Sequence, residues 1–210
     1  MVMNMKHKKF FAITVCSLLL FTVYFYRDPD RPITKGENII LSPADGTIEY
    51  INFYKSGNPE VFKDGNCYVV NVSKYFPNGC YVIGIFMSPL DVHVNRAPIG
   101  GDVVYIKHIN GAFYPAFLSG VQKINERNIV IIKNGSEYVG VVQIAGFVAR
   151  RCWLKIHEGE HVDMGERIGM IKLGSQTALI IPSDYTLKVK VGEKLYAGES
   201  IVAIKKGENN

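Results

Sequence analysis

A stretch near the C-terminal end of the chain is repeated, and this repeat limits the folds that the chain can adopt. Residues 155–168 match residues 188–201 at a constant offset of 33 residues. Glycines occupy equivalent places in the two copies, namely Gly159, Gly165, Gly192 and Gly198. Each copy consists of a glycine turn, an apolar residue, a second glycine turn and a short apolar strand. Because each copy can bury its apolar face only against a partner, the repeat predicts one shared small β structure.

The rest of the chain beyond residue 38 is also patterned as strands. Short β-branched and aromatic runs, separated by Gly, Asn and Pro, cover residues 46–53, 67–72, 80–86, 102–108, 128–133 and 137–144. Long amphipathic helical patterns are missing from this part of the sequence. The glycine-turn repeat resembles half of a lipoyl-like barrel-sandwich hybrid, so we expect a compact, mainly β domain that contains such an element. Two independent hairpins with the same turn residues are the alternative.

The N-terminal segment predicts a membrane anchor. Residues 10–26 carry no charge and follow a basic tail, residues 1–9. As a helix they would span about 26 Å, close to the hydrocarbon core of a bilayer at roughly 30 Å. A cleaved signal peptide would need small residues at its end, whereas this segment ends in aromatic residues. We therefore expect a single-pass anchor in the cell membrane, a linker at residues 27–37 and one domain at residues 38–210.

Charge and cysteine content exclude several classes of protein. The formal net charge is +5, and the basic residues are scattered, so nucleic acid is not an expected partner. Basic residues flank the anchor on both sides, which leaves its orientation open. The four cysteines show no C-x-x-C spacing, so neither a disulfide framework nor a metal site is expected. A weakly basic surface is compatible with membrane lipids as partners.

Three segments contain residues suited to chemistry. The first is the dipeptide Gly174-Ser175, which lies between the two repeat copies. Taken alone it is a common turn, but Ser175 could also attack the preceding carbonyl, and a glycine tolerates the backbone strain that this requires. Elimination from the resulting ester, followed by hydrolysis, would leave an N-terminal pyruvoyl group.

The other two segments contain potential partners for that serine. Residues 42–48 are expected to form a turn that contains Asp45, and turns of this composition usually have a structural role only, which is to reverse the chain. Residues 86–98 place Asp91, His93, Asn95 and Arg96 in an otherwise apolar stretch. An extended chain would put the first three of these side chains on one face, either at a solvated edge or in a site.

These segments, together with residues 141–151, resemble the phosphatidylserine decarboxylase family in sequence and in order, over most of residues 38–205. The short chain and the sequence of residues 91–98 most resemble the short, archaeal-type branch of the prokaryotic enzymes. The resemblance implies a proenzyme that cuts itself between Gly174 and Ser175. The products would be a β chain of residues 1–174 and an α chain of residues 175–210, held together as a heterodimer.

The resemblance also implies roles for individual residues. Ser175 would become the pyruvoyl cofactor, with which the amine of phosphatidylserine forms a Schiff base before CO2 leaves and phosphatidylethanolamine is released. His93 would take the hydroxyl proton of the serine, and Asp45 would orient the imidazole. Longer family members have a second histidine where this chain has Arg96, so His93 would serve both maturation and turnover. Many members read Ser-Thr after the glycine, so that threonine stands where this chain has Gln176.

The lipid phosphate needs a cation, and three arginines are candidates for it. They are Arg96, Arg150 and Arg151, because a guanidinium can bind phosphate through two hydrogen bonds. Two other functions stay open from the sequence. One is a membrane-anchored barrel-sandwich adaptor without catalysis, and the other is a decarboxylase for a related amino-acid head group.

Overall fold

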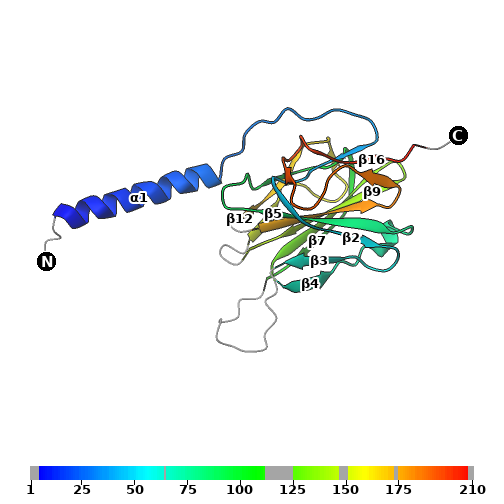
Figure 1. The fold of residues 1–210 in the computed structure, drawn as a ribbon, viewed down its shortest axis with the longest axis horizontal. Coiled ribbons are helices and arrows are strands. Elements are labelled where there is room, and N and C mark those ends of the chain that lie inside the picture. The colour runs from blue at the N-terminus through cyan, green and yellow to red at the C-terminus, as the bar shows by residue number, and fades with distance from the viewer. Residues whose placement is uncertain (1–4, 64, 112–124, 147–150, 173–174, 208–210) are drawn as a thin grey trace.

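The computed structural model of the chain describes residues 5–63, 65–111, 125–146, 151–172 and 175–207. It contains an N-terminal helix, α1 (Met5–Phe25), followed by a β domain (Figure 1). The helix begins at Met5, before the expected start of the anchor at residue 10, and so includes the basic residues of the N-terminal tail. Its 21 residues span about 31 Å, enough to cross a membrane. All its side chains are exposed except that of Phe25, which packs on the domain.

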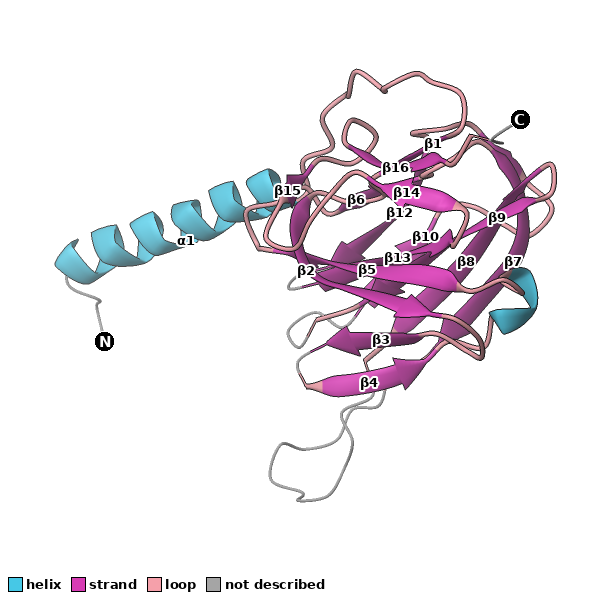
Figure 2. Cartoon of the chain, turned by 45° about the vertical axis from the view of Figure 1, so that its right-hand side comes forward, coloured by secondary structure: helices cyan, strands magenta, loops and turns pink. Residues whose placement is uncertain are grey.

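The domain is built around one large antiparallel sheet, which confirms the expected mainly β fold. Its eight strands, in spatial order, are β11 (His161–Val162), β7 (Gly101–Ile109), β8 (Arg127–Asn134), β9 (Glu137–Ile144), β13 (Ser175–Pro182), β5 (Cys80–Met87), β2 (Gly46–Tyr54) and β15 (Lys194–Leu195). Figure 2 shows that the sheet is strongly curled. The central strands are rich in valine and isoleucine and are buried on both faces over most of their length, because further layers cover the sheet on each side.

Smaller elements form these covering layers. On one face lie two three-stranded sheets, β10 (Arg151–Leu154), β12 (Arg167–Lys172) and β6 (Val94–Arg96), and β1 (Ile39–Leu41), β16 (Ile201–Lys205) and β14 (Tyr185–Leu187). The larger hydrophobic core lies between them and the main sheet. On the other face, a second core packs under the hairpin β3 (Glu60–Lys63) and β4 (Asn66–Val69) and the 3-10 helix η1 (Ser73–Tyr75).

The two repeat copies pack into one structure, as their sequence predicted. Their short strands, β11 and β15, form the two edges of the large sheet. Their second glycine turns meet, and Ile33 of the linker lies against both. A Cβ atom would come within 2.6 Å of Ile33 Cδ1 at Gly165 and within 2.8 Å at Gly198, so only glycine fits at these positions. Both glycines also have positive φ angles, of 80° and 76°.

Candidate active site

The predicted cleavage bond lies where β13 enters the large sheet. Ser175 is the first residue of β13 and is paired in register with Met87, the last residue of β5. Gly174 lies outside the described residues. The strand before the bond, β12, ends at Lys172, so the structure fixes the backbone on both sides of the predicted site.

His93 lies beside the same short connection. The loop that follows β5 leads through His93 into β6, and the carbonyl of His93 accepts a hydrogen bond from the backbone nitrogen of Ile171 at 3.1 Å. The chain that links β12 to β13 therefore starts next to His93 and ends opposite Met87. Strand pairing thus brings together His93 and Ser175, which are far apart in the sequence.

The imidazole of His93 is arranged to act as a base. The side chain is fully buried, and its Nδ1 lies 2.9 Å from the carbonyl oxygen of Asp91. Because a carbonyl can only accept a hydrogen bond, Nδ1 carries the proton in the neutral ring and Nε2 keeps its lone pair. Nε2 has no hydrogen-bond partner in the described structure. Burial lowers the pKa of His93, so the ring is neutral and able to take a proton at pH 7.

Asp91 fixes the loop that carries this carbonyl. One carboxylate oxygen lies 2.5 Å from Lys194 Nζ, and the other accepts a hydrogen bond from the backbone nitrogen of Ser88 at 2.8 Å. Burial alone would raise the pKa of Asp91, but the hydrogen bonds from Lys194 and Ser88 outweigh it and hold the pKa below its usual value. Asp91, His93 and Asn95 are all buried, so this segment is not a solvated edge.

Asp45 lies at the same end of the sheet but has other partners. Its neighbour Gly46 begins β2, which pairs with the last residues of β5. The buried carboxylate accepts a hydrogen bond from the Ala197 nitrogen at 2.8 Å and one from Arg31 Nη2 at 2.6 Å. Because the Asp91 carbonyl, and not Asp45, holds the imidazole, the role of Asp45 in maturation stays a prediction.

The three arginines predicted to bind phosphate lie in different surroundings. Arg96 is buried and donates hydrogen bonds to the carbonyl oxygens of Gly165 and Pro29, at 3.0 and 3.1 Å, so it attaches the linker to the domain. Arg151 is 68% exposed and pairs in register with Lys172, close to the predicted cleavage bond. Arg150 lies outside the described residues. Phosphate binding by these arginines stays a prediction.

A row of hydrogen-bonded, buried polar side chains leads inward from the site. Of its members, only Asn95 was expected from the sequence. Asn95 donates to the hydroxyl of Thr177 at 3.0 Å, Gln143 donates to Asn95 at 2.8 Å, and Asn128 donates to Gln143 at 2.8 Å. Thr177 lies two residues beyond Ser175 on β13, so this row of side chains begins close to the predicted cleavage bond. The alternation of side chains along a strand predicts which residues share a face of that strand. It does not predict which residues on different strands contact one another.

The linker and the end of α1 also contact the site, and no pattern in the sequence predicts these contacts. The ring of Phe25 lies 4.3 Å from the imidazole of His93, measured between ring centroids. Arg31 bridges Asp45 and Glu199, the latter at 2.7 Å. These contacts depend on how the N-terminal segment docks, and no local pattern encodes that docking.

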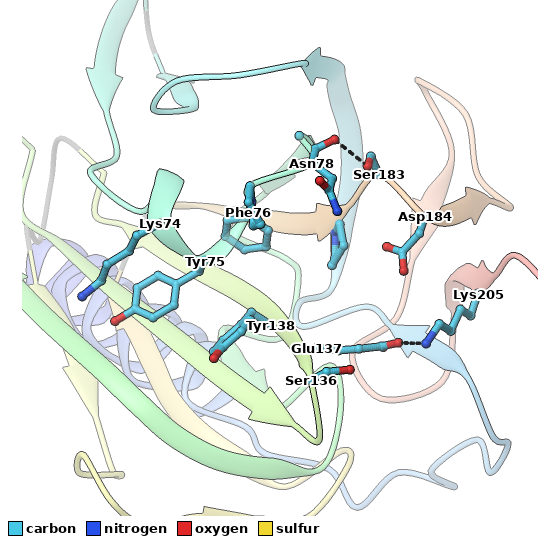
Figure 3. Close-up of a pocket in the computed structure, with 13 residues that line it drawn as sticks. Lys74, Tyr75, Phe76, Asn78, Ser136, Glu137, Tyr138, Ser183, Asp184 and Lys205 are labelled. Atoms are coloured by element: carbon cyan, nitrogen blue, oxygen red, sulfur yellow. Dashed lines mark hydrogen bonds and ion pairs between the residues drawn. The ribbon is translucent and has the colours of Figure 1, made fainter.

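The pocket drawn in Figure 3 lies at the opposite end of the sheet from this site. It has a volume of about 340 Å³, and its lining includes Pro182, the last residue of β13, with Tyr138 and the ion-paired Glu137 and Lys205. The whole length of β13 separates it from Ser175. The pocket is therefore not where a reaction at Ser175 would take place.

Comparison with known proteins gives one consistent result. The model of a family described as phosphatidylserine decarboxylase matches residues 18–203. A Methanocaldococcus jannaschii protein, provisionally named an archaetidylserine decarboxylase proenzyme, is 81% identical over 97% of this chain and 99% of its own length. A protein of the same name from Methanothermobacter thermautotrophicus is 42% identical over 91% of this chain and 84% of its own. A phosphatidylserine decarboxylase proenzyme from Chlorobium phaeobacteroides is 37% identical, over 89% and 80%.

Proposed function

This chain belongs to the phosphatidylserine decarboxylase family, and we propose that it cuts itself at Gly174-Ser175 and then decarboxylates the serine head group of a membrane lipid. Within the family it is a carboxy-lyase. The observation that supports the proposal most strongly is the imidazole of His93, which is buried and neutral and lies beside the start of β13 with an unpaired Nε2. A membrane adaptor would have no use for such a base.

Self-cleavage begins with the hydroxyl of Ser175. His93 Nε2 accepts its proton while the oxygen attacks the carbonyl carbon of Gly174, and the peptide C–N bond breaks to leave an ester. Loss of the α proton of the former serine then expels the Gly174 carboxylate. Hydrolysis of the dehydroalanine that remains releases ammonia and leaves a pyruvoyl group on the new N-terminus. Asp45 is bound to Arg31 and Ala197 at the same end of the sheet, so its proposed part in maturation is to order this end of the domain.

The described residues suit a pyruvoyl group at position 175. The group supplies the electron sink for decarboxylation. His93 is placed to hold a proton at Nε2 and deliver it to the substrate carbon after CO2 has left. Phe25 covers the imidazole, and His93 and Met87 are fully buried, so water has little access to the base.

The two chains produced by cleavage stay together as a heterodimer. The α chain contributes β13, which pairs with β5 on one side and β9 on the other, both in the β chain. Ala178, Leu179, Ile180 and Ile181 of β13 are fully buried. A 36-residue chain cannot bury these side chains alone, so separation would expose the core of the domain.

The substrate is a phospholipid with a serine head group. The two relatives with the archaeal name point to archaetidylserine, and the bacterial relatives point to phosphatidylserine. Both lipids present the same amine, carboxylate and phosphate to the site. The α1 helix anchors the enzyme in the membrane as a single span, and its last turn lies against His93, so the site opens near the bilayer surface.

Decarboxylation of a carboxyl-labelled lipid tests the proposal. The full-length protein should release labelled CO2 from vesicles that contain phosphatidylserine or archaetidylserine. With a lipid labelled elsewhere in the serine, cyanoborohydride should attach the label to the small chain. The Ser175→Ala protein is the matched control and should do neither. Absence of both CO2 release and trapping from a folded wild-type protein would favour the adaptor without catalysis. Faster release from another amino-acid phospholipid would assign a different head group.

A further inference from the structure

The end of α1 and the first residues after it contact the loop that carries His93. The hydroxyl of Tyr24 and Arg27 Nη2 both donate to the carbonyl oxygen of Leu90, at 3.3 and 2.6 Å. Leu90 belongs to the loop that leads to His93. Figure 2 shows the end of α1 against the side of the domain that carries β15 and the start of β2. The last turn of the helix is thus attached to the loop that forms the site.

Within this segment, Arg27 differs from the other arginines around the site. Its guanidinium donates to two backbone carbonyl oxygens, those of Tyr24 at 2.9 Å and Leu90 at 2.6 Å, and it stacks on the Tyr24 ring at 3.8 Å. Four arginines that lie nearby have carboxylate partners, namely Arg31, Arg96, Arg151 and Arg167. Among the described residues, no carboxylate pairs with Arg27, so its charge is available to an anion.

Arg27 is also close to the reacting groups. Phe25, two residues earlier, lies on the imidazole of His93. Burial is the largest cause of the lowered pKa of His93, and the positive charge of Arg27 lowers it further. In a serine phospholipid, only an ester oxygen and a methylene separate the phosphate from the carbon that carries the amine and carboxylate. A lipid whose carboxylate is at the reaction centre therefore places its phosphate a short distance away, on the side facing the membrane.

The depth of Arg27 in the membrane fits the same ligand. It follows directly after the apolar helix, whose last residues are aromatic and belong at the interface between hydrocarbon and head groups. Lipid phosphates lie at that depth. A guanidinium is suited to them because it offers several donors in one plane and keeps its charge when partly buried.

From these contacts we propose that Arg27 binds the phosphate of the lipid head group and so selects a phospholipid as substrate. This inference rests on the proposed function and adds a residue from the anchor end of the chain to the substrate site. Of the three arginines predicted from the sequence, Arg96 and Arg151 have carboxylate partners, and Arg150 lies outside the described residues.

Steady-state kinetics of full-length Arg27→Gln test the proposal, with the lipid as phosphatidylserine in phosphatidylcholine vesicles. Because Arg27 also holds the Leu90 carbonyl of the His93 loop, the extent of maturation is measured by gel and the kinetic constants are expressed per matured enzyme. The KM of the variant for phosphatidylserine should rise about tenfold or more, with kcat changed by less than about threefold, as expected for the loss of a charge-assisted hydrogen bond. Arg27→Lys keeps the charge and should recover part of the loss.

Arg167→Gln is the matched control. Arg167 also attaches the linker, through Asp28 at 2.6 Å and Asp30 at 2.8 Å, but it makes these contacts on the surface. Its KM should stay near the wild-type value. An unchanged KM in Arg27→Gln would overturn the proposal, and so would an equal rise in both variants, because that would assign the effect to loosening of the linker. Wild-type activity tests the proposed function separately, so the two failures can be distinguished.

Discussion

At the scale of single residues, the two nitrogens of His93 have different tasks. Nδ1 is held by the Asp91 carbonyl, and Nε2 is left without a partner in a buried position. A buried polar atom without a hydrogen bond lowers the stability of the fold. Such an atom is therefore usually found where it has a function in binding or catalysis. The structure therefore supports a proton-accepting role for His93, which the family resemblance had implied.

Replacing His93 tests this role. His93→Ala should slow self-cleavage at least about a hundredfold, the usual contribution of a general base. Cleavage can be followed by gel after cell-free synthesis of the proenzyme. His157→Ala is the control, since His157 has a side chain that is 87% exposed, and it should be cut at the wild-type rate. Cleavage of both variants at the same rate would reject the assignment.

The pH dependence of cleavage follows from the burial of the imidazole. A histidine can act as a base only while it is neutral, and burial lowers the pKa of His93. The folded proenzyme therefore keeps its base to a lower pH than an ordinary histidine would, whose pKa is about 6.5. The cleavage rate should be constant down to about pH 6.5 and fall only below it. A midpoint above that pH would show that another group limits the reaction.

Arg31 is the residue whose importance the sequence did not indicate. It pairs with the buried Asp45, and the pair is only 14% and 5% exposed. Arg31→Gln should destabilise the uncut Ser175→Ala protein by about 2–3 kcal/mol, because a buried carboxylate loses its cation. Thermal melting should show Tm lowered by roughly 4–10 °C. Arg167→Gln, which removes exposed ion pairs, should change Tm by much less, and equal losses would contradict this account.

At the scale of elements, the sequence predicted the long strands other than β13. The runs at 46–53, 80–86, 102–108, 128–133 and 137–144 correspond closely to β2, β5, β7, β8 and β9. The run at 67–72 was too long, since β4 ends at Val69 and the backbone of Val70 bonds to Pro59 instead. Short strands such as β6 and β10 have too few residues to show a period. Their positions depend on pairing with β12, which is distant in the sequence.

The buried amide chain connects three of these elements and can be tested by its stability. Gln143 on β9 joins Asn95 on β6 to Asn128 on β8. Gln143→Leu should lower the stability of the Ser175→Ala protein by about 2–4 kcal/mol, because it leaves an oxygen of Asn95 and a nitrogen of Asn128 unpaired. In the Gln143→Leu protein, a further Asn95→Leu change should lower the free energy of unfolding by less than the same change does in the parent. Chemical unfolding of the two single variants and the double variant would measure this coupling. Strictly additive losses would show that the contacts are independent.

At the scale of the whole molecule, the position of the proposed cleavage bond would allow a cut chain to stay folded. The bond separates the two repeat copies, so β12 stays in the β chain while β13 to β16 belong to the α chain. The copies still meet at Gly165 and Gly198. The repeat in the sequence predicted this shared structure. It could not predict that β13 would be a central strand, because strand order depends on tertiary pairing.

The anchor and the site form one unit in the same way. Phe25 lies on His93, Arg27 holds the loop of the site, and Arg31 holds Asp45. The sequence identified a span and a linker as separate parts and gave the linker no function. The structure instead places the linker over the site, as suits an enzyme whose substrate arrives from a membrane.

We propose above all that the chain cuts itself at Gly174-Ser175 and converts Ser175 into its cofactor. Intact mass measured under denaturing conditions tests it most directly. The account predicts two chains, a large one ending at Gly174 and a small one of 36 residues that is lighter by one ammonia than the peptide beginning with serine. An active protein that consists only of the uncut 23.5 kDa chain would contradict it.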